Sequence, residues 1–349
     1  MNVVVFSGTT EGRELSRQLA ALGIEVTVSV ATPLGQEEQG STPGVTVRCG
    51  RLLPDEMAAL LGDAALCIDA THPYAVEATK NIKAAAEKNP IIQGIHLEGP
   101  FISMEKKGAQ NPAYIRNPDV EMFLRLQEAA HGLVRLITIA PETDGAKEFI
   151  RRLADQVHIS VGHTCSDYET AYRAFSQGAD HVTHFFNAMP PFTHRAPGVF
   201  GAAFDAKHVM PELICDGIHI DASAVRVVFS LFGAERMILI SDSMMATGME
   251  DGAYSLGGLP VTVRGNLATL EDGTIAGSAT NLMDCMRKAV SMGIPLETAV
   301  RAATYNPARA IGAADVCGSI TAGHRGDCVL LSKDDLSTKK VIFGGKVVA

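Results

Sequence analysis

The sequence predicts an α/β protein of three segments: a Rossmann-like parallel sheet over residues 1–88, a (β/α) barrel of the TIM type over 90–310, and strands of a β-sandwich over 311–349. Short apolar runs alternate with periodic helices through most of the chain, a pattern typical of parallel βαβ units. From residue 90 onwards polar residues follow the strand ends, where (β/α) barrels carry their active sites. After Asn306 short β segments separated by glycines replace this pattern. We expect these last strands to pack on the barrel.

Length and composition limit the class of protein. The chain has 349 residues, 46% of them hydrophobic, which is enough for two domains or for one large domain with an appendage. A net charge of −9 argues against nucleic acids and anionic membrane surfaces as partners. Seven cysteines without a CxxC pair are typical of reduced thiols. We read no signal peptide and no apolar run of ~18 residues, and therefore expect a soluble cytoplasmic protein.

The first strand-to-helix turn contains two glycines. Backbone N–H groups at the start of a helix suit a phosphate, so this turn is a candidate nucleotide site formed by Gly8, Thr9, Thr10 and Gly12. A tight βα turn without a ligand is an equally weighted alternative, because the full G-x-G-x-x-G pattern is absent. The second strand ends without an acidic residue for a ribose hydroxyl, which favours NADP over NAD.

Three motifs of this segment, "GTTEGREL", "VTVSVAT" and "DATHPYA", together resemble the N-terminal half of the precorrin-6A reductases, NADPH-dependent enzymes of cobalamin synthesis. The resemblance covers residues 1–88 and implies NADP(H) as a cofactor of this segment. The second domain of that family has no counterpart in the sequence, so we do not expect reduction of a corrin ring. His72 in the third motif is expected to be structural or to line a ligand.

Six strands are predicted in the barrel segment, at residues 91–97, 134–139, 157–161, 181–185, 212–215 and 237–240. Glu98, His163 and His184 each follow a separate strand, as a site at the mouth of a barrel requires. A carboxylate with two imidazoles is a familiar ligand set for zinc or iron and leaves positions open for water and substrate. One histidine at a strand end is more often structural, but three such residues favour a metal. Because neighbours along a strand face opposite sides, we assign core or flanking roles to His96, His158 and His181.

Asp242 follows the last of these strands and is a candidate acid/base. An aspartate near a metal can take a proton from water and pass it to a leaving group. The alternative is a helix N-cap, which an Asp-Ser pair also suits. Asn187, Arg195 and His219 add donors to this segment. Arg and His beside a metal predict a small anionic substrate such as a phosphate ester.

Over residues 90–349 the chain closely resembles the N-acetylglucosamine-6-phosphate deacetylases of the amidohydrolase superfamily, through "HLEGPF", "GHTCSDYETAYRAFSQGADHVTHFFNAMPPF", "CDGIHID", "ISDSMMATG" and "AGSATNLMDCMRKAV". The resemblance implies one divalent metal on the three predicted ligands, Asp242 as acid/base, hydrolysis of the acetamide with release of acetate, and a homodimer. Gln110 and His219 would also polarise the carbonyl, and Leu282 would close over the acetamido group. The residues implied to bind the sugar phosphate are Ala109, Gln110, Asn187, Ala188, Arg195 and His219.

One part of the family pattern is absent. The usual first barrel strand, of the type "PGxIDxHxHG", has no counterpart, so we expect a barrel that lacks this strand and holds at most one metal. Either the strand in "ALCIDATH" substitutes for it, or the reductase-like segment only abuts the barrel, as in a fusion. Two other functions stay open: an NADPH-binding oxidoreductase module, or a protein that binds sugar phosphate on an incomplete, inactive barrel.

Overall fold

The computed structural model describes residues 2–8, 10–62, 64, 66–70 and 93–348. The chain divides into two compact units. The first consists of Met1–Gln93, Leu126–Leu133 and Arg325–Ala349, and the second of Gly94–Arg125 and Val134–His324. The α/β class predicted from the alternation is confirmed. Within the described residues no helix combines the length and the apolar character needed to cross a membrane.

The first unit contains a parallel four-stranded sheet in the order β3-β2-β1-β4. Its strands and helices alternate along the chain: β1 (Asn2–Ser7), α1 (Thr10–Ala21), β2 (Glu25–Val30), α2 (Pro33–Gln39), β3 (Val45–Cys49), α3 (Pro54–Leu61) and β4 (Leu66–Ala70). Val3 and Val5 pack with Leu19 of α1, whereas Val4 and Phe6 pack with Met57 of α3. Because successive strand residues face opposite sides, α1 and α3 cover the two faces of this sheet.

The strand in "ALCIDATH" belongs to this sheet. Residues 66–70 of β4 pair in parallel with 3–7 of β1, so the described part of this motif extends the N-terminal sheet and does not substitute for a barrel strand. The same unit includes the C-terminal strands β15 (Cys328–Leu331), β16 (Thr338–Phe343) and β17 (Lys346–Val347). They form an antiparallel three-stranded sheet, and their assignment to a β-sandwich stays a prediction.

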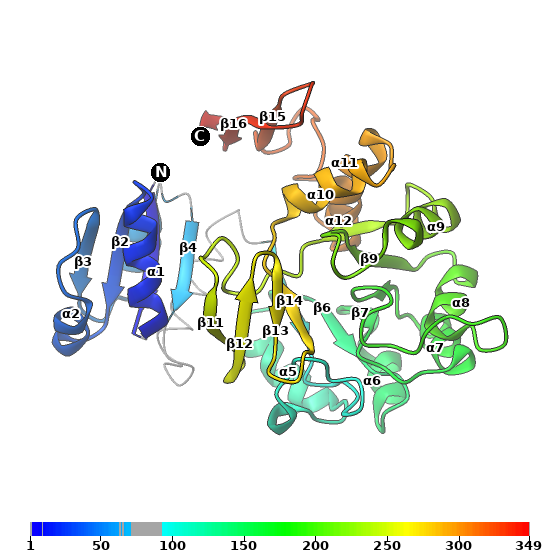
Figure 1. Cartoon of the computed structure of the whole chain (residues 1–349). Coiled ribbons are helices and arrows are strands. Elements are labelled where there is room, and N and C mark those ends of the chain that lie inside the picture. Colours follow the sequence, from blue (N-terminus) through cyan, green and yellow to red (C-terminus); the bar gives the residue numbers. More distant parts are fainter. Residues whose placement is uncertain (1, 9, 63, 65, 71–92, 349) are drawn as a thin grey trace. The chain divides into compact units, whose positions relative to one another are not determined.

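The second unit is built on six parallel strands that lie side by side in chain order (Figure 1). They are β5 (Ile95–Glu98), β6 (Val134–Ile139), β7 (His158–Val161), β8 (His181–Val182), β9 (Met210–Ile214) and β10 (Ile238–Ile240). The helices of the segment are α5 (Val120–Ala129), α6 (Ala146–Leu153), α7 (Tyr168–Ser176), α8 (Gly198–Asp205), α9 (Ala222–Phe232), α10 (Leu282–Ser291), α11 (Leu296–Ala303) and α12 (Tyr305–Ala310), with a short 3₁₀ turn at Pro112–Tyr114. Among the described residues β5 and β10 are the two edges, so the sheet is an open half-barrel.

A strand lies at each of the six predicted places, but several bounds differ: β5 begins at Ile95, four residues later than predicted, and β7 and β10 each begin one residue later. The predicted strand over 181–185 ends at Val182, and a turn follows. The backbone φ angles of His184 and Phe186 are 29° and 74°, in the left-handed region that a β-strand does not use. The chain therefore leaves the sheet just before the metal-ligand candidate His184.

A four-stranded antiparallel sheet follows β10 and was not predicted. It consists of β11 (Gly252–Leu256), β12 (Leu259–Arg264), β13 (Leu267–Thr269) and β14 (Ile275–Ser278), in that order. The alternating stretch "AYSLGGLPVTVRGNLATL" carries the hairpin signal, with "GG" and "GN" at its turns. Val261, Val263 and Ala268 form the buried core of this sheet.

The inner layer of the half-barrel is polar and closely packed. Thr138 of β6 and Ser160 of β7 both hydrogen-bond the Oγ1 atom of Thr183, at 2.7 and 2.6 Å. All three side chains are buried. Gly162 lies against them, since a Cβ atom there would come within 2.8 Å of Thr183 Cβ and 2.9 Å of Thr138 Cγ2. This contact leaves no room for a side chain at residue 162.

We therefore expect Gly162→Ala to lower the free energy of unfolding by about 1–3 kcal/mol through overpacking. Chemical denaturation with far-ultraviolet circular dichroism measures the change. Gly252→Ala is the matched control, because its Cβ would meet nothing closer than 3.7 Å, and it should change stability by less than about 0.5 kcal/mol. Equal effects of the two substitutions would contradict this packing.

Candidate metal centre and active site

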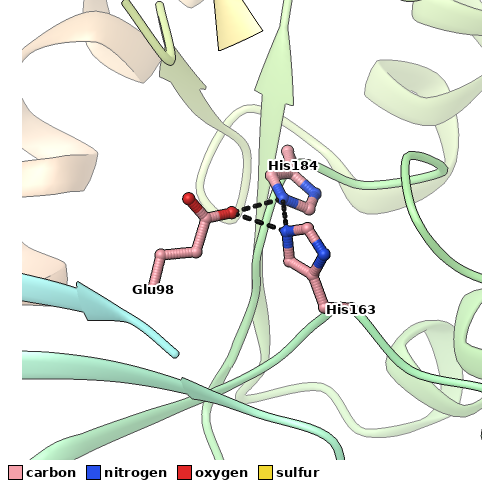
Figure 2. A group of neighbouring side chains, drawn as sticks. All are labelled: Glu98, His163 and His184. Atoms are coloured by element: carbon pink, nitrogen blue, oxygen red, sulfur yellow. Dashed lines mark hydrogen bonds and ion pairs between the residues drawn. The ribbon is translucent and has the colours of Figure 1, made fainter. Parts of the chain in front are cut away.

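Three side chains from separate strands converge on one point of the second unit. Glu98 is the last residue of β5, and His163 and His184 follow β7 and β8 at the same carboxyl edge of the sheet. Glu98 Oε1 lies 2.8 Å from His163 Nε2 and 2.7 Å from His184 Nε2 (Figure 2). The two Nε2 atoms lie 2.9 Å apart. The structure thus brings together the three residues that the sequence predicts as metal ligands.

The backbone is strained where it presents these groups. His163 has φ 46°, His184 φ 29° and Asp242 φ 49°, all in the left-handed region that disfavours residues with a Cβ atom. Each such residue costs on the order of 1–3 kcal/mol, and such strain is concentrated at functional sites. Three strained residues at the carboxyl edge of one parallel sheet therefore indicate a functional site at this edge, independently of the chemistry of their side chains.

Hydrogen bonding sets the protonation of the cluster. Burial by itself would raise the pKa of Glu98, but its close contacts with the His163 and His184 rings hold that pKa well below its usual range. Burial by itself would lower the pKa of His184, yet its hydrogen bond to Glu98 and the nearby charges of Glu98, Asp242 and Glu212 raise it to about 8. Without a metal, the cluster therefore holds a proton on His184 opposite an ionised Glu98.

The donor set fits a metal ion. His163 Nδ1 donates a hydrogen bond to the carbonyl oxygen of Lys106 at 2.7 Å, so the proton of the neutral ring lies on Nδ1 and the lone pair of Nε2 faces the cluster. Two buried imidazole nitrogens and a carboxylate oxygen are ligands that zinc and iron both accept. The opposite ring nitrogen of His184 points away from Glu98 (Figure 2).

Asp242 lies two residues after β10 and lines the same pocket. Ser278 N donates to Asp242 O at 2.7 Å and Met244 N donates to Ser278 O at 2.8 Å, so β14 anchors the loop that carries Asp242. Burial, with the nearby charge of Glu98, raises the pKa of Asp242 above its usual value. A carboxylate with a raised pKa is a better proton acceptor, as an acid/base residue needs.

The pocket in front of the cluster has a volume of about 570 Å³. Four of its lining residues come from the β11–β14 sheet or its turns, namely Leu256, Thr274, Ile275 and Gly277, so the sheet absent from the prediction forms one wall. Of the residues predicted to contact substrate, this pocket includes Ala109, Gln110, Asn187, Ala188 and His219. Arg195 lies on an exposed loop and does not line it, and Leu282 lines a neighbouring pocket.

His219 is oriented by a residue that the sequence analysis left out. Asp216 Oδ2 accepts a hydrogen bond from His219 Nδ1 at 2.6 Å, and Asp216 Oδ1 accepts from the backbone N–H groups of Ile218 and His219 at 2.9 Å each. The other ring nitrogen of His219 is therefore available to the pocket. The "CDGIHID" motif contains both residues, so their separation of three positions was the available signal.

The predicted nucleotide turn is only partly described. Gly8 is exposed, Gly12 is buried in α1, and α1 begins at Thr10. Thr9, the side chain of Thr10 and His72 lie outside the described residues. NADP(H) binding at this turn stays a prediction.

A second group with metal-ligand chemistry lies at the opposite ends of the strands. Asp180 accepts hydrogen bonds from His158 Nδ1 and His181 Nδ1, each at 2.6 Å. Although burial opposes it, these two bonds hold the pKa of Asp180 well below its usual range. Hydrogen bonding within the trio accounts for this arrangement, at the amino ends of β7 and β8.

Glu142 is a further residue that the sequence analysis did not single out. Its Oε1 atom accepts from the backbone N–H of Cys165 at 2.6 Å, and its Oε2 atom accepts from Thr164 Oγ1 and Ser166 Oγ at 2.5 and 2.8 Å. Thr164 and Ser166 are buried and lie in the loop that follows the ligand candidate His163. The position of Glu142 just after the strand β6 was the signal that could have identified it.

We expect Glu142→Ala to lower the free energy of unfolding by about 1–3 kcal/mol, because it leaves three donors without a charged acceptor. Chemical denaturation of the metal-free protein measures this loss. Glu148→Ala is the matched control: Glu148 forms an exposed ion pair with Arg151, and its loss should cost less than about 0.5 kcal/mol. A smaller loss in Glu142→Ala than in the control would disprove the support assigned to Glu142.

Comparison with known proteins places the chain in a family. Residues 65–348 match the amidohydrolase family. The match leaves residues 1–64 outside it, and the resemblance of 1–88 to the reductases stays a prediction.

Individual relatives agree with this match. The chain is 43% identical over 257 residues to an N-acetylglucosamine-6-phosphate deacetylase of Bacillus subtilis, covering 72% of this chain and 65% of that protein. It is 34% identical over 242 residues to an N-acetylgalactosamine-6-phosphate deacetylase of Escherichia coli O157:H7, covering 69% of this chain and 64% of that protein. The matched part thus spans slightly under two thirds of the length of both relatives.

A solved structure extends the similarity to the fold. The crystal structure of N-acetyl-D-glucosamine-6-phosphate deacetylase from Mycobacterium smegmatis superposes with a TM-score of 0.75 at 31% sequence identity, covering 99% of this chain and 86% of that chain. Its fold, the family match over 65–348 and the two deacetylase relatives point the same way. The chain belongs to the amidohydrolase family.

Proposed function

We propose that the chain hydrolyses the acetamide of N-acetylglucosamine 6-phosphate to glucosamine 6-phosphate and acetate. The observation that carries this proposal is the convergence of Glu98, His163 and His184 in one pocket with Asp242. The two relatives named above support an acetylated amino-sugar phosphate as substrate. Because one of them is named for the galacto sugar, the epimer is the closest competing substrate.

The three ligands would hold one divalent ion, zinc or iron. When bound, the metal supplies the Lewis acidity that activates water towards an amide carbonyl. Asp242 takes the proton of the attacking water on its carboxylate and delivers it to the departing nitrogen, so that acetate leaves and the amine is freed. The raised pKa of Asp242 supports this role.

The substrate would lie in the 570 Å³ pocket, which Gln110 and His219 line together with the three ligands. Gln110 Nε2 lies 3.5 Å from Glu98 Oε2, which suits a donor to the carbonyl of a bound acetamide.

Arg195 lies on an exposed loop, and we propose a homodimer in which such residues contact the phosphate across the interface. Seven free cysteines support a reducing compartment such as the cytoplasm.

The half-barrel motivates an alternative function. The sequence offers no His-x-His strand, and β5 is an edge of the described sheet with residues 95–98 only partly covered or exposed. If an absent first strand spoils the site, the chain would bind sugar phosphate without turnover. The N-terminal sheet, with the strand order β3-β2-β1-β4, favours NADP(H) binding as a separate property of the first unit.

Purified protein loaded with Zn²⁺ or Fe²⁺ should release acetate from N-acetylglucosamine 6-phosphate, and more slowly from the galacto epimer. Asp242→Asn should lower kcat by about 10²–10⁴-fold, because the proton acceptor is lost. The matched control is Asp180→Asn, at the other end of the strands, which should retain turnover. If folded, metal-loaded protein binds the sugar phosphate but releases no acetate, the binding-protein alternative is correct.

Metal affinity should depend on pH. Because the pKa of His184 is about 8 without metal, a bound ion must displace its proton below that pH. The apparent association constant should therefore rise about tenfold per unit up to about pH 8 and then level off. Competition with a chromophoric chelator from pH 6 to 9 measures it, and a flat profile below pH 8 would show that no proton is displaced.

A further inference from the structure

The two histidines of the metal cluster are supported unequally. His163 Nδ1 donates to the Lys106 carbonyl at 2.7 Å, which fixes its ring. His184 is 4% exposed, and its Nδ1 atom has no hydrogen-bond partner among the described residues. Metal-binding histidines almost always donate their outer N–H to an acceptor, which fixes the tautomer and the orientation of the ring. His184 therefore needs an acceptor on the side facing away from Glu98 (Figure 2).

Among the described residues, Glu212 of β9 lacks a hydrogen-bond donor, just as His184 lacks an acceptor. It is also 4% exposed, and its Oε2 atom has no hydrogen-bond partner within the described part of the chain. A buried carboxylate without a partner is costly, so its presence in the interior calls for a donor. The strand register brings it close to His184, because Phe185 N donates to Glu212 O at 2.8 Å.

Both residues line the same pocket, of about 360 Å³, on the inner side of the half-barrel. Its wall also contains Thr183, Ser241 and Asp242, whose polar groups can hold water. One water molecule takes about 30 Å³ and needs two to four polar partners, so this pocket can hold several. A water between Glu212 and His184 would satisfy both unpartnered atoms.

We propose that Glu212 is the positioning residue of His184: its carboxylate accepts the Nδ1–H of His184 through water held in this pocket. The inference rests on the proposed role of His184 as a metal ligand. The ring is then held as the tautomer whose unprotonated Nε2 faces the metal, and a carboxylate partner raises the basicity of that nitrogen. Glu212 thus does for His184 what the Lys106 carbonyl does for His163.

The test compares Glu212→Leu and Glu212→Gln with the unaltered chain. Loss of such an outer partner should weaken metal affinity by about 10–100-fold, measured by chelator competition, and shift the visible absorption spectrum of the Co²⁺-loaded protein. Glu212→Gln keeps an acceptor oxygen and should retain more affinity. Circular dichroism and chemical denaturation of both metal-free variants check that they fold before metal is added.

A purely structural role for Glu212 predicts that metal affinity and the Co²⁺ spectrum stay unchanged in both variants. Glu148→Ala, which removes an exposed carboxylate paired with Arg151, should leave both metal readouts unchanged. If Glu212→Leu does not fold, the metal affinity and the Co²⁺ spectrum of Glu212→Gln test the proposal, and values equal to those of the unaltered chain contradict it. If the unaltered chain takes up no metal, the proposed function fails. If it binds metal and releases acetate while the Glu212 variants match it, only the role of Glu212 is wrong.

Discussion

The chemistry of the second unit depends on one contact: Glu98 Oε1 lies within 2.8 Å of two imidazole nitrogens that are themselves 2.9 Å apart. Two ring nitrogens at this distance cannot both carry a hydrogen, and a carboxylate beside them needs positive charge. A shared proton or a metal ion satisfies both demands. The parallel sheet makes this convergence possible, because the carboxyl ends of β5, β7 and β8 lie along one edge.

Loops hold this cluster, and the surrounding hydrogen bonds compensate their strain. His163 and His184 have left-handed backbones, and neither is a glycine. The Lys106 carbonyl orients the first ring, and Glu142 holds the residues that follow it through three hydrogen bonds. Loops held by several such contacts can maintain a backbone conformation that is rarely populated in isolated peptides. The precision of the site therefore depends on polar contacts between loops distant in sequence.

The inner layer of the half-barrel is polar beneath the site. Thr138, Ser160 and Thr183 form a hydrogen-bonded row, and Glu212 lies in the same interior without a protein partner in the described structure. An apolar core would be more stable, so such groups persist where they position a functional residue.

The sequence by itself determined the alternating architecture, the six parallel strands and the residues at their ends. Residues at the ends of parallel strands share one edge, so Glu98, His163 and His184 could be grouped without coordinates. Only the tertiary structure decided the β11–β14 wall of the pocket, the hydrogen-bond partners of Glu142, and the position of Arg195 on an exposed loop outside the pocket lining. The spacing of apolar residues in the sequence indicates which face of a single helix or strand is buried. It does not indicate which side chains from distant loops meet, because those contacts depend on how the loops pack in three dimensions.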